Sequence, residues 1–386
     1  MDVVLLGLAI VTLSYLLFVI IECIVGYSGI MGLAEQAVLP HEQLPSISII
    51  FSALNEDASL EKTLNSFLAL NYPKLEIIAI NDRSTDKTGM ILETMQQLHP
   101  ELKVCSIKEL PDGWLGKNHA LHYGSQLATS DWLLFTDADV LMSNTIVAKA
   151  ISYALEKKMD HITIFEHHIR KKFWLNAILL GTYVAYSMVI KPWRIRYAWS
   201  KSYLGHGAFN LVNKQAYQHC GGHSAIAMEC FDDMKLGKLL KKNGYKQDVV
   251  NGKDLIEREW YSSVQEMVKG LQKNGFAHFN FRFSKFLIDF TFSLLFFLWP
   301  FCAVIVFSGM IQWLNFTIII LTFYLYSYVA KQFRMNSCFA FLYPIAMCML
   351  FYTIWNSVIT TYKNNGIIWR NTHYPLNKLK NKNTNI

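Results

Sequence analysis

The chain has 386 residues, of which 52% are hydrophobic, and it carries a net charge of +7. Long apolar segments exclude a wholly soluble enzyme, a disordered chain and a small disulfide-rich scaffold. The surplus charge lies in residues 331–386, which hold seven Lys or Arg and no Asp or Glu. Because this charge flanks apolar segments, we expect it to face a membrane and not a nucleic acid.

The N-terminal apolar run covers Val3 to Val25, with Glu22 as its charged residue close to the end. It is too long for the core of a signal peptide, and no basic leader precedes it. About 20 apolar residues are enough to cross a bilayer. We therefore expect residues 1–30 to form a retained transmembrane anchor.

Residues 46–284 are typical of an α/β domain, because strand-like and helical patterns alternate along them. The strand-like runs cover residues 46–53, 75–80, 103–107 and 132–136, and helical patterns fall at 60–70, 86–98 and 118–128. This order predicts a parallel sheet, in which ligands bind at the carboxyl ends of the strands.

The C-terminal part holds three apolar segments, at 286–307, 311–330 and 339–360, each long enough to span a bilayer. We expect residues 285–362 to form a transmembrane region and residues 363–386 a basic cytoplasmic tail. A further apolar segment, 173–189, contains polar residues and is expected to be an amphipathic helix lying on the bilayer surface. If it crossed, Asp139 and Asp232 would face opposite sides of the membrane.

The expected topology contains a conflict. Basic residues favour the cytoplasmic side, which places the catalytic domain, the Arg170–Lys172 stretch and the tail there. Three full C-terminal spans would leave the tail outside. Either one of these segments is re-entrant or interfacial, or the tail breaks the rule; Pro300 in the first segment favours a bent or incomplete crossing.

Acidic residues recur at the ends of predicted strands or in the loops beyond them. The four clusters are Glu56/Asp57, Asp82/Asp86, Asp137/Asp139 and Asp232/Asp233. A D-x-D pair at a strand end presents two carboxylates to a hard cation such as Mg²⁺ or Mn²⁺. A bound cation neutralises the charge of a diphosphate leaving group. The alternative is that these residues are turn residues or helix caps, a role that suits Asp86 ahead of its helix.

The order and spacing of these motifs resemble the family 2 glycosyltransferases, inverting enzymes that use nucleotide-sugars. The resemblance covers residues 46–246 and implies a GT-A, Rossmann-like α/β domain between the N-terminal anchor and the C-terminal transmembrane helices. The matching motifs are Ala53-x-Asn55-Glu56, Asn81-Asp82-Arg83-Ser84-Thr85-Asp86, Gly116-Lys117-Asn118, Asp137-Ala138-Asp139 and Asp232-Asp233-Met234.

The resemblance implies that the donor is bound by the first four of these motifs. The expected nucleotide-sugar-binding residues are Ala53, Asn55, Glu56, Asp82, Lys117 and Asp137. Asp139 is the expected direct metal ligand, with Asp137 nearer the ribose but also in the metal site. Lys117 resembles the lysine that lies close to the nucleotide.

The family's catalytic base is the second acid of a Glu-Asp dipeptide, which corresponds here to Asp232-Asp233. The role falls on Asp233, and the change from Glu to Asp at position 232 leaves open which of the two carboxylates acts. The base would deprotonate an acceptor hydroxyl for in-line attack on the anomeric carbon. Both acids also fit the first turn of a helix, where they would cap it.

Other motifs concern the acceptor. Gly205, His206 and Gly207 are expected to line its pocket, although His206 also fits an ordinary structural histidine. Residues 265–274 lack the Arg-Trp of processive synthases. The Trp369-Arg370-x-x-x-Tyr374 tail resembles membrane lipid glycosyltransferases, including ceramide glucosyltransferases, and residues 213–223 are closer to bacterial carotenoid (diaponeurosporenoate) glycosyltransferases.

The resemblance thus implies a membrane enzyme that transfers one sugar. We expect a metal-dependent inverting glycosyltransferase in the cell membrane, multi-pass, with its catalytic domain in the cytoplasm. The expected donor is a nucleotide-sugar with UDP as its nucleotide, and the expected acceptor is a membrane lipid hydroxyl or carboxylate. One alternative is transfer to a polyprenyl phosphate, and another is a membrane protein that binds nucleotide-sugars without catalysis.

Overall fold

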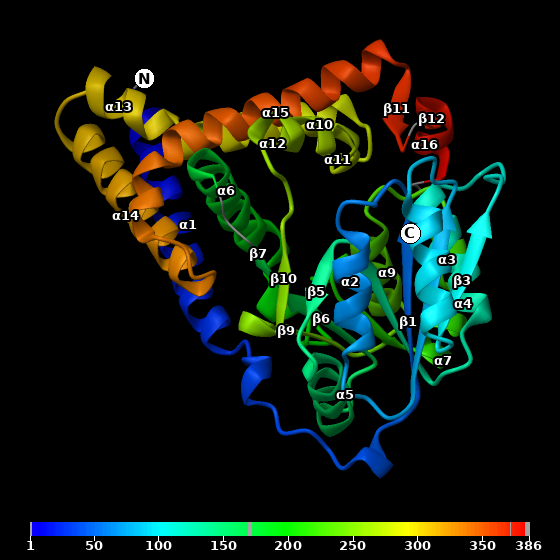
Figure 1. Ribbon diagram of the computed structural model, residues 1–386. Helices are drawn as coiled ribbons and strands as arrows, with labels where there is room; N and C mark the ends of the chain where they lie inside the picture. The colour runs from blue at the N-terminus through cyan, green and yellow to red at the C-terminus, as the bar shows by residue number, and fades with distance from the viewer. Residues whose placement is uncertain (1, 169–171, 371, 383–386) are drawn as a thin grey trace.

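The computed structural model describes residues 2–168, 172–370 and 372–382. A mixed sheet flanked by helices lies beside a group of long apolar helices, as Figure 1 shows. The sheet has seven strands in the order β3-β2-β1-β4-β8-β6-β9. Their bounds are β1 Ile47–Ala53, β2 Leu75–Asp82, β3 Leu102–Ile107, β4 Trp132–Asp137, β6 His161–Phe165, β8 Asn210–Asn213 and β9 Gln247–Asn251.

Strand β1 lies in the middle of the sheet and fixes its register. It runs parallel to β2, with Ala53 opposite Asn81, and parallel to β4, with Ser52 opposite Asp137. The carboxyl ends of the three strands therefore lie at one edge, and the parallel sheet that the sequence predicts is confirmed for them. Strand β8 is antiparallel to both of its neighbours, which makes the whole sheet mixed.

Apolar side chains of β1 point alternately to the two faces of the sheet, as the two-residue repeat of a strand requires. Phe51 and Ile49 pack into the core on one face, while Ile50 packs into the core on the other. The helices of the domain cover these faces. They are α2 Leu60–Leu68, α3 Thr88–Leu98, α4 Gly116–Leu127, α5 Ile146–Lys157, α7 Lys214–His219, α8 Gly222–Ala225 and α9 Asp232–Lys242.

Two small sheets lie outside the main one. The first has the order β5-β10-β7, formed by Val140–Met142, Ile256–Arg258 and His167–His168. The second is a hairpin of β11 (Gly366–Trp369) and β12 (Thr372–Pro375), followed by the short helix α16 (Leu376–Lys382). Both matter for function, because β10 and the hairpin carry side chains into the acidic edge of the main sheet.

Four helical segments of the described chain are long and apolar enough to cross a membrane: Asp2–Ser28, Phe173–Arg194, Met310–Gln332 and Ser337–Lys363. They contain helices α1 Asp2–Ser28, α6 Phe173–Ile190, α14 Met310–Gln332 and α15 Tyr343–Lys363. Helices α12 (Phe283–Phe297) and α13 (Trp299–Val306) form a further apolar pair, bent by 47°. The break lies next to Pro300, which confirms the expected bend.

Helix α6 differs from the amphipathic helix that the sequence predicts. Ile178, Leu180 and Val184 are buried, but Trp174 and Val189 are exposed, so the helix is apolar on both sides. It packs against α14 and α15. Two shorter helices, α10 (Val264–Gly270) and α11 (Gln272–Ala277), connect the domain to this group, and α11 packs against α15.

Candidate active site

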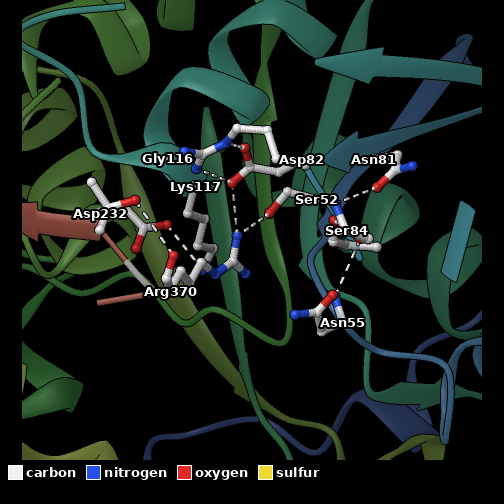
Figure 2. A network of polar contacts seen from close by, with 12 residues as sticks. Ser52, Asn55, Asn81, Asp82, Ser84, Gly116, Lys117, Asp232 and Arg370 are labelled. Carbon is white, nitrogen blue, oxygen red and sulfur yellow. Dashed lines mark hydrogen bonds and ion pairs between the residues drawn. The ribbon is translucent and has the colours of Figure 1, made fainter. Parts of the chain in front are cut away.

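The loops that follow β1 and β2 are tied together by Asn55. Its side-chain oxygen accepts a hydrogen bond from the backbone N–H of Thr85 (2.8 Å), and its own N–H donates to Ser84 Oγ (3.2 Å). Asn55 has a φ of 57°, in the left-handed region that asparagine tolerates better than most residues. Figure 2 shows Asn55, Ser84 and Asn81 grouped beside the ends of the strands. Asn55 thus shapes the edge where Ala53 ends β1.

Glu56 follows in the same loop and is partly buried. Burial raises the pKa of Glu56 to about 7, and the nearby Asp139 carboxylate adds to this effect. Its backbone N–H donates to Thr88 Oγ1 (2.8 Å). Asp86, in contrast, accepts a hydrogen bond from the backbone N–H of Thr88 (2.9 Å), where α3 begins, which fits a cap.

Asp82 lies at the end of β2 and its side chain is fully buried. It forms ion pairs with Arg83 (2.8 Å) and, at 3.4 Å, with Arg370 from the C-terminal hairpin. Figure 2 shows Arg370 pointing at Asp82 and Ser52. A Cβ at Gly116 would lie 2.7 Å from Asp82 Oδ2, so this position at the start of α4 requires glycine.

Lys117 joins two acidic clusters that are far apart in the sequence. Its ammonium lies 2.8 Å from Asp137 at the end of β4 and 3.1 Å from Asp232 at the start of α9. Figure 2 shows the contact between Lys117 and Asp232. Although burial opposes it, the charge of Asp137 raises the pKa of Lys117. The ammonium therefore stays charged and holds the two clusters in one site.

The D-x-D pair is bridged by an arginine from β10. Arg258 donates from Nη1 to Asp137 (2.9 Å) and from Nε to Asp139 (3.1 Å). Lys117 and Arg258 together hold the pKa of Asp137 below its ordinary value, against the effect of burial. Burial raises the pKa of Asp139, and the charge of Asp137 acts in the same direction.

The D-x-D pair has free coordinating capacity. Asp139 Oδ1 is buried and has no hydrogen-bond partner in the described part of the chain. Within that same part, no three His, Cys, Asp or Glu side chains form a group suited to a metal. One or two carboxylates completed by substrate phosphates and water suit Mg²⁺. The residues present thus fit a divalent cation that shares its ligands with a bound diphosphate.

Asp233 lies close to Asp137 of the D-x-D pair, and Gly207 lies between the two side chains. A Cβ at Gly207 would lie 2.7 Å from Asp137 Oδ2 and 3.4 Å from Asp233 Oδ2. A Cβ at Gly205 would clash with the backbone oxygen of Asp233 at 1.9 Å. Burial raises the pKa of Asp233, and the adjacent Asp232 raises it further. The two glycines therefore let the loop run between the D-x-D pair and Asp233.

His206, between these glycines, pairs with a buried acid. Its Nδ1 lies 2.6 Å from Glu166 Oε2. Burial lowers the pKa of a histidine, but the Glu166 carboxylate outweighs this and raises the pKa of His206. The imidazole is therefore charged over a wider pH range than a free histidine and adds a cation near Asp233.

Two residues of the site, Arg258 and Glu166, are absent from the motifs assigned above, and a third, Arg370, belongs to a motif assigned to the acceptor and not to this edge. Arg258 and Glu166 lie in stretches without a recognisable spacing, so nothing in the sequence indicates them. Arg370 has a signal, since it belongs to the Trp369-Arg370-x-x-x-Tyr374 tail, and Gly116 N–H donates to the Tyr374 hydroxyl (3.2 Å). The structure brings the tail to the site and also assembles the expected residues around Lys117.

Comparison with known proteins gives the same family as the motifs. Residues 48–221 match the family model described as glycosyl transferase family 2. The 4,4'-diaponeurosporenoate glycosyltransferase of Staphylococcus haemolyticus (strain JCSC1435) is 28% identical over 245 residues, covering 60% of this chain and 62% of that protein. The protein of the same name from Staphylococcus aureus (strain MRSA252) is 24% identical over 242 residues, covering 60% of both chains. The match thus spans about three fifths of these relatives' length.

A solved structure shares the fold. The mannosyltransferase PcManGT from Pyrobaculum calidifontis, in complex with GDP-Man and Mn²⁺, superposes with a TM-score of 0.55 at 15% identity. The superposition covers 93% of this chain and 99% of that one. The expected GT-A fold is confirmed by this similarity, together with the mixed sheet.

Proposed function

Because residues 48–221 match the model of glycosyl transferase family 2, we propose that the protein is a metal-dependent inverting glycosyltransferase. It moves a sugar from a nucleoside-diphosphate donor, a UDP-sugar, to the hydroxyl or carboxylate of a membrane lipid. The observation that supports this most directly is the position of Lys117, which contacts Asp137 of the D-x-D pair and Asp232 of the later acidic cluster. Donor-binding and transfer groups thus lie within a few ångströms of each other.

The donor binds along the edge formed by β1, β2 and β4. Glu56 and Asp82 contact the nucleoside, with Ala53 and Asn55 shaping the loop beside it. Asp139 and Asp137 hold the divalent cation, Mg²⁺ or Mn²⁺, and the solved structure with GDP-Man and Mn²⁺ supports this choice. When bound, the cation neutralises the negative charge of the leaving diphosphate. Lys117 and Arg258 add fixed positive charge next to the same D-x-D pair.

Transfer takes place at the gap beside Gly207, between Asp137 and Asp233. With a hydroxyl acceptor, Asp233 accepts the proton as the oxygen attacks the anomeric carbon from the face opposite the diphosphate. The raised pKa of Asp233 brings it closer to the pH range in which a general base is effective. Asp232 keeps Lys117 in place.

A lipid acceptor is supported by the surroundings of the site. The relatives are named for diaponeurosporenoate, and the long apolar helices of this chain support a site close to a membrane. Helix α15 runs from the group of long apolar helices to the C-terminal hairpin above the catalytic domain, with α10 and α11 beneath it (Figure 1). An acceptor that stays in the membrane reaches the site along these helices.

We place both ends of α6 on one side of the membrane. Strands β1, β2, β3, β4 and β6 precede this helix and β8 and β9 follow it, yet all belong to one sheet. A crossing by α6 would divide the sheet between two compartments. Although it is long and apolar enough to span, α6 therefore stays on the side of the catalytic domain, as the sequence argument from Asp139 and Asp232 predicts.

The same reasoning applies to the C-terminal helices. Arg370 contacts Asp82, so the tail lies on the domain side and an even number of crossings separates it from Phe283. The end of α14 also lies there, since Tyr328 donates to the Ile24 carbonyl near the end of α1 (3.3 Å). We propose that α1, the bent α12–α13 pair and α14 cross, while α15 lies at the membrane surface against α6. Arg170 and Lys171, expected on the cytoplasmic side, lie outside the described residues.

This topology resolves the parity conflict in favour of an interfacial segment. Lys331 and Arg334 at the end of α14 lie on the same side as the domain, so the positive-inside rule places the domain in the cytoplasm. Cysteine substitution at Val306 and at Arg334 tests this with a membrane-impermeant thiol reagent. In intact cells we expect labelling at 306 and not at 334, and the reverse pattern contradicts the topology.

The activity test uses the purified full-length protein with Mn²⁺, labelled UDP-sugars and total membrane lipid, followed by mass spectrometry of the product. We expect a lipid heavier by one sugar residue. Asp139→Ala removes a proposed metal ligand and is expected to lower transfer at least about 100-fold, and to weaken Mn²⁺ binding in equilibrium titrations. Asp57→Ala, an exposed acid of the same edge, is the matched control. Full transfer by Asp139→Ala contradicts the metal assignment.

A further inference from the structure

Lys273 differs from the other cations of the site in its partners. It lies in the first turn of α11, and its ammonium is 3.5 Å from the centre of the Trp369 ring. Within the described residues, no carboxylate lies within ion-pair distance of it, whereas Lys117 pairs with two. A cation over an indole is stabilised by the ring, but this is weaker than a buried ion pair.

The charges around Lys273 belong to the site. Burial lowers the pKa of Lys273 to about 8, and the nearby Lys117 acts in the same direction, while Asp232 opposes it. An ammonium held among other cations and away from water is costly unless an anion joins it. The surroundings of Lys273 thus favour an anionic ligand.

An apolar groove lies on the neighbouring helices α10 and α15. It runs between α10 and the first half of α15, has a volume of about 300 Å³, and is lined by Val264, Val268, Ile345, Cys348, Met349, Tyr352 and Thr353. One turn beyond Thr353, Ser357 of α15 donates to the carbonyl of Gln272, the residue before Lys273. The start of α11, which carries Lys273, therefore packs on α15 one turn beyond the end of the groove.

We propose that Lys273 binds an anionic oxygen, carboxylate or phosphate, on the head of the lipid acceptor, whose apolar chain lies in the groove between α10 and α15. This inference rests on the proposed function and narrows the acceptor from membrane lipids in general to lipids with an anionic head. Arg258 and Lys117 already serve the donor side through the D-x-D pair. Lys273 lies instead where the catalytic domain meets the apolar helices, which is the side from which a membrane lipid arrives.

An anionic acceptor also changes the transfer step. A lone pair of the carboxylate or phosphate oxygen forms a bond to the anomeric carbon while the bond from this carbon to the diphosphate oxygen breaks. The electron pair of the broken bond leaves with the nucleoside diphosphate. No proton moves in this step, so the acceptor needs a cation to hold it and no base to activate it.

The test measures binding to the purified full-length protein in a non-ionic detergent. The probes share one apolar chain: palmitate, hexadecyl phosphate and hexadecanol, with UDP as a probe of the donor side. We expect one or both anionic lipids to bind at least tenfold more tightly than hexadecanol. Lys273→Met is expected to remove this preference while the affinities for hexadecanol and UDP stay within twofold, and Lys273→Arg is expected to keep it.

Two further variants control the result. Lys269→Met removes an exposed lysine from the neighbouring α10 and is expected to change nothing. Val268→Trp fills the groove and is expected to weaken the anionic lipids and hexadecanol equally. The anion that binds more tightly identifies the head group. The proposal is overturned if Lys273→Met weakens UDP and not the anionic lipids, or if it leaves all four affinities unchanged. Because binding needs no turnover, this outcome is separate from a failed transfer assay.

Discussion

The donor edge and the acceptor side of the site balance their charges in different ways. At the donor edge, Asp82 pairs with Arg83, and the D-x-D pair is bridged by Arg258. On the acceptor side, Asp233 accepts a backbone N–H of Met234, and Lys273 lies over an aromatic ring. In the proposed function, a donor and its cation therefore compete with internal ion pairs, whereas an acceptor meets charges that are less well compensated.

The largest expected effect tests the acceptor side. Asp233→Asn removes the proposed base and is expected to lower transfer to a neutral hydroxyl lipid by about 10²–10⁴-fold. Transfer to an anionic lipid is expected to fall by less than tenfold, because its oxygen carries no proton. The measurement compares turnover with the acidic and the neutral fractions of membrane lipid. Equal losses with both fractions would show that Asp233 has another role.

The donor edge is tested by Arg258→Met. Removal of this cation leaves Asp139 without its ion pair and Asp137 with Lys117 as its remaining partner. The loss of one partner of a buried pair costs about 3 kcal/mol of unfolding free energy. We expect a lower Tm without metal and a larger rise in Tm with Mn²⁺ than the unchanged protein shows. Differential scanning fluorimetry in detergent measures both.

The control for Arg258 is Arg334→Met, which breaks an ion pair with Asp254 whose side chains are 50% and 72% exposed. Exposed pairs contribute about 0–1 kcal/mol, so its Tm should change little. A similar response of the two variants to Mn²⁺ would argue against Arg258 as a competitor of the cation.

The boundary between the two regions is tested by Gly207→Ala. The added methyl would lie 2.7 Å from Asp137 Oδ2, so one side of the gap has to shift. We expect about tenfold slower transfer, since small displacements of reacting groups are costly, with unchanged Tm. Gly7→Ala, which meets nothing within 4 Å, is the control. An equal rate for both variants would show that the gap is wider than the contacts indicate.

The smallest expected effect concerns pH. Glu56 has a pKa of about 7 in the fold and 4.5 as its ordinary value, so the folded state binds the proton more tightly than the unfolded state. Its protonation stabilises the metal-free fold most at about pH 4.5 and below, and this contribution is lost as pH rises through 7. We expect Glu56→Gln to flatten the fall of Tm between pH 5 and 7. Glu61→Gln, on the exposed side of α2, should keep the slope of the unchanged protein.

Much of the donor edge follows from local patterns. The alternation of apolar residues in Ile47–Ala53 predicts a buried strand, and Asn-Glu and Asn-Asp after such strands predict a polar edge. Asp137 and Asp139 lie where this rule places them, at and just beyond the end of β4, whereas Lys117 at the start of α4 is expected from the family resemblance. The positions of the two aspartates depend on a strand and on the turn that follows it. Both are specified by residues that are close together in the sequence.

The counter-charges do not follow in this way. Arg258 lies 119 residues beyond Asp139, and Arg370 lies 288 residues beyond Asp82. Glu166 precedes α6 in the sequence and His206 follows it, yet their side chains form an ion pair. No periodicity connects residues at such separations, because their contacts depend on how strands and helices from different parts of the chain pack.

By itself, the sequence determined an α/β domain with acids at its strand ends, apolar segments at both ends of the chain and a basic tail. The tertiary structure decided which cations neutralise these acids, and it joined the strands before and after α6 in one sheet. Apolar length measures only the ability to cross a bilayer. We propose that helix α6 keeps both ends on one side of the membrane, because the hydrogen bonds of a single sheet join the strands before it to the strands after it.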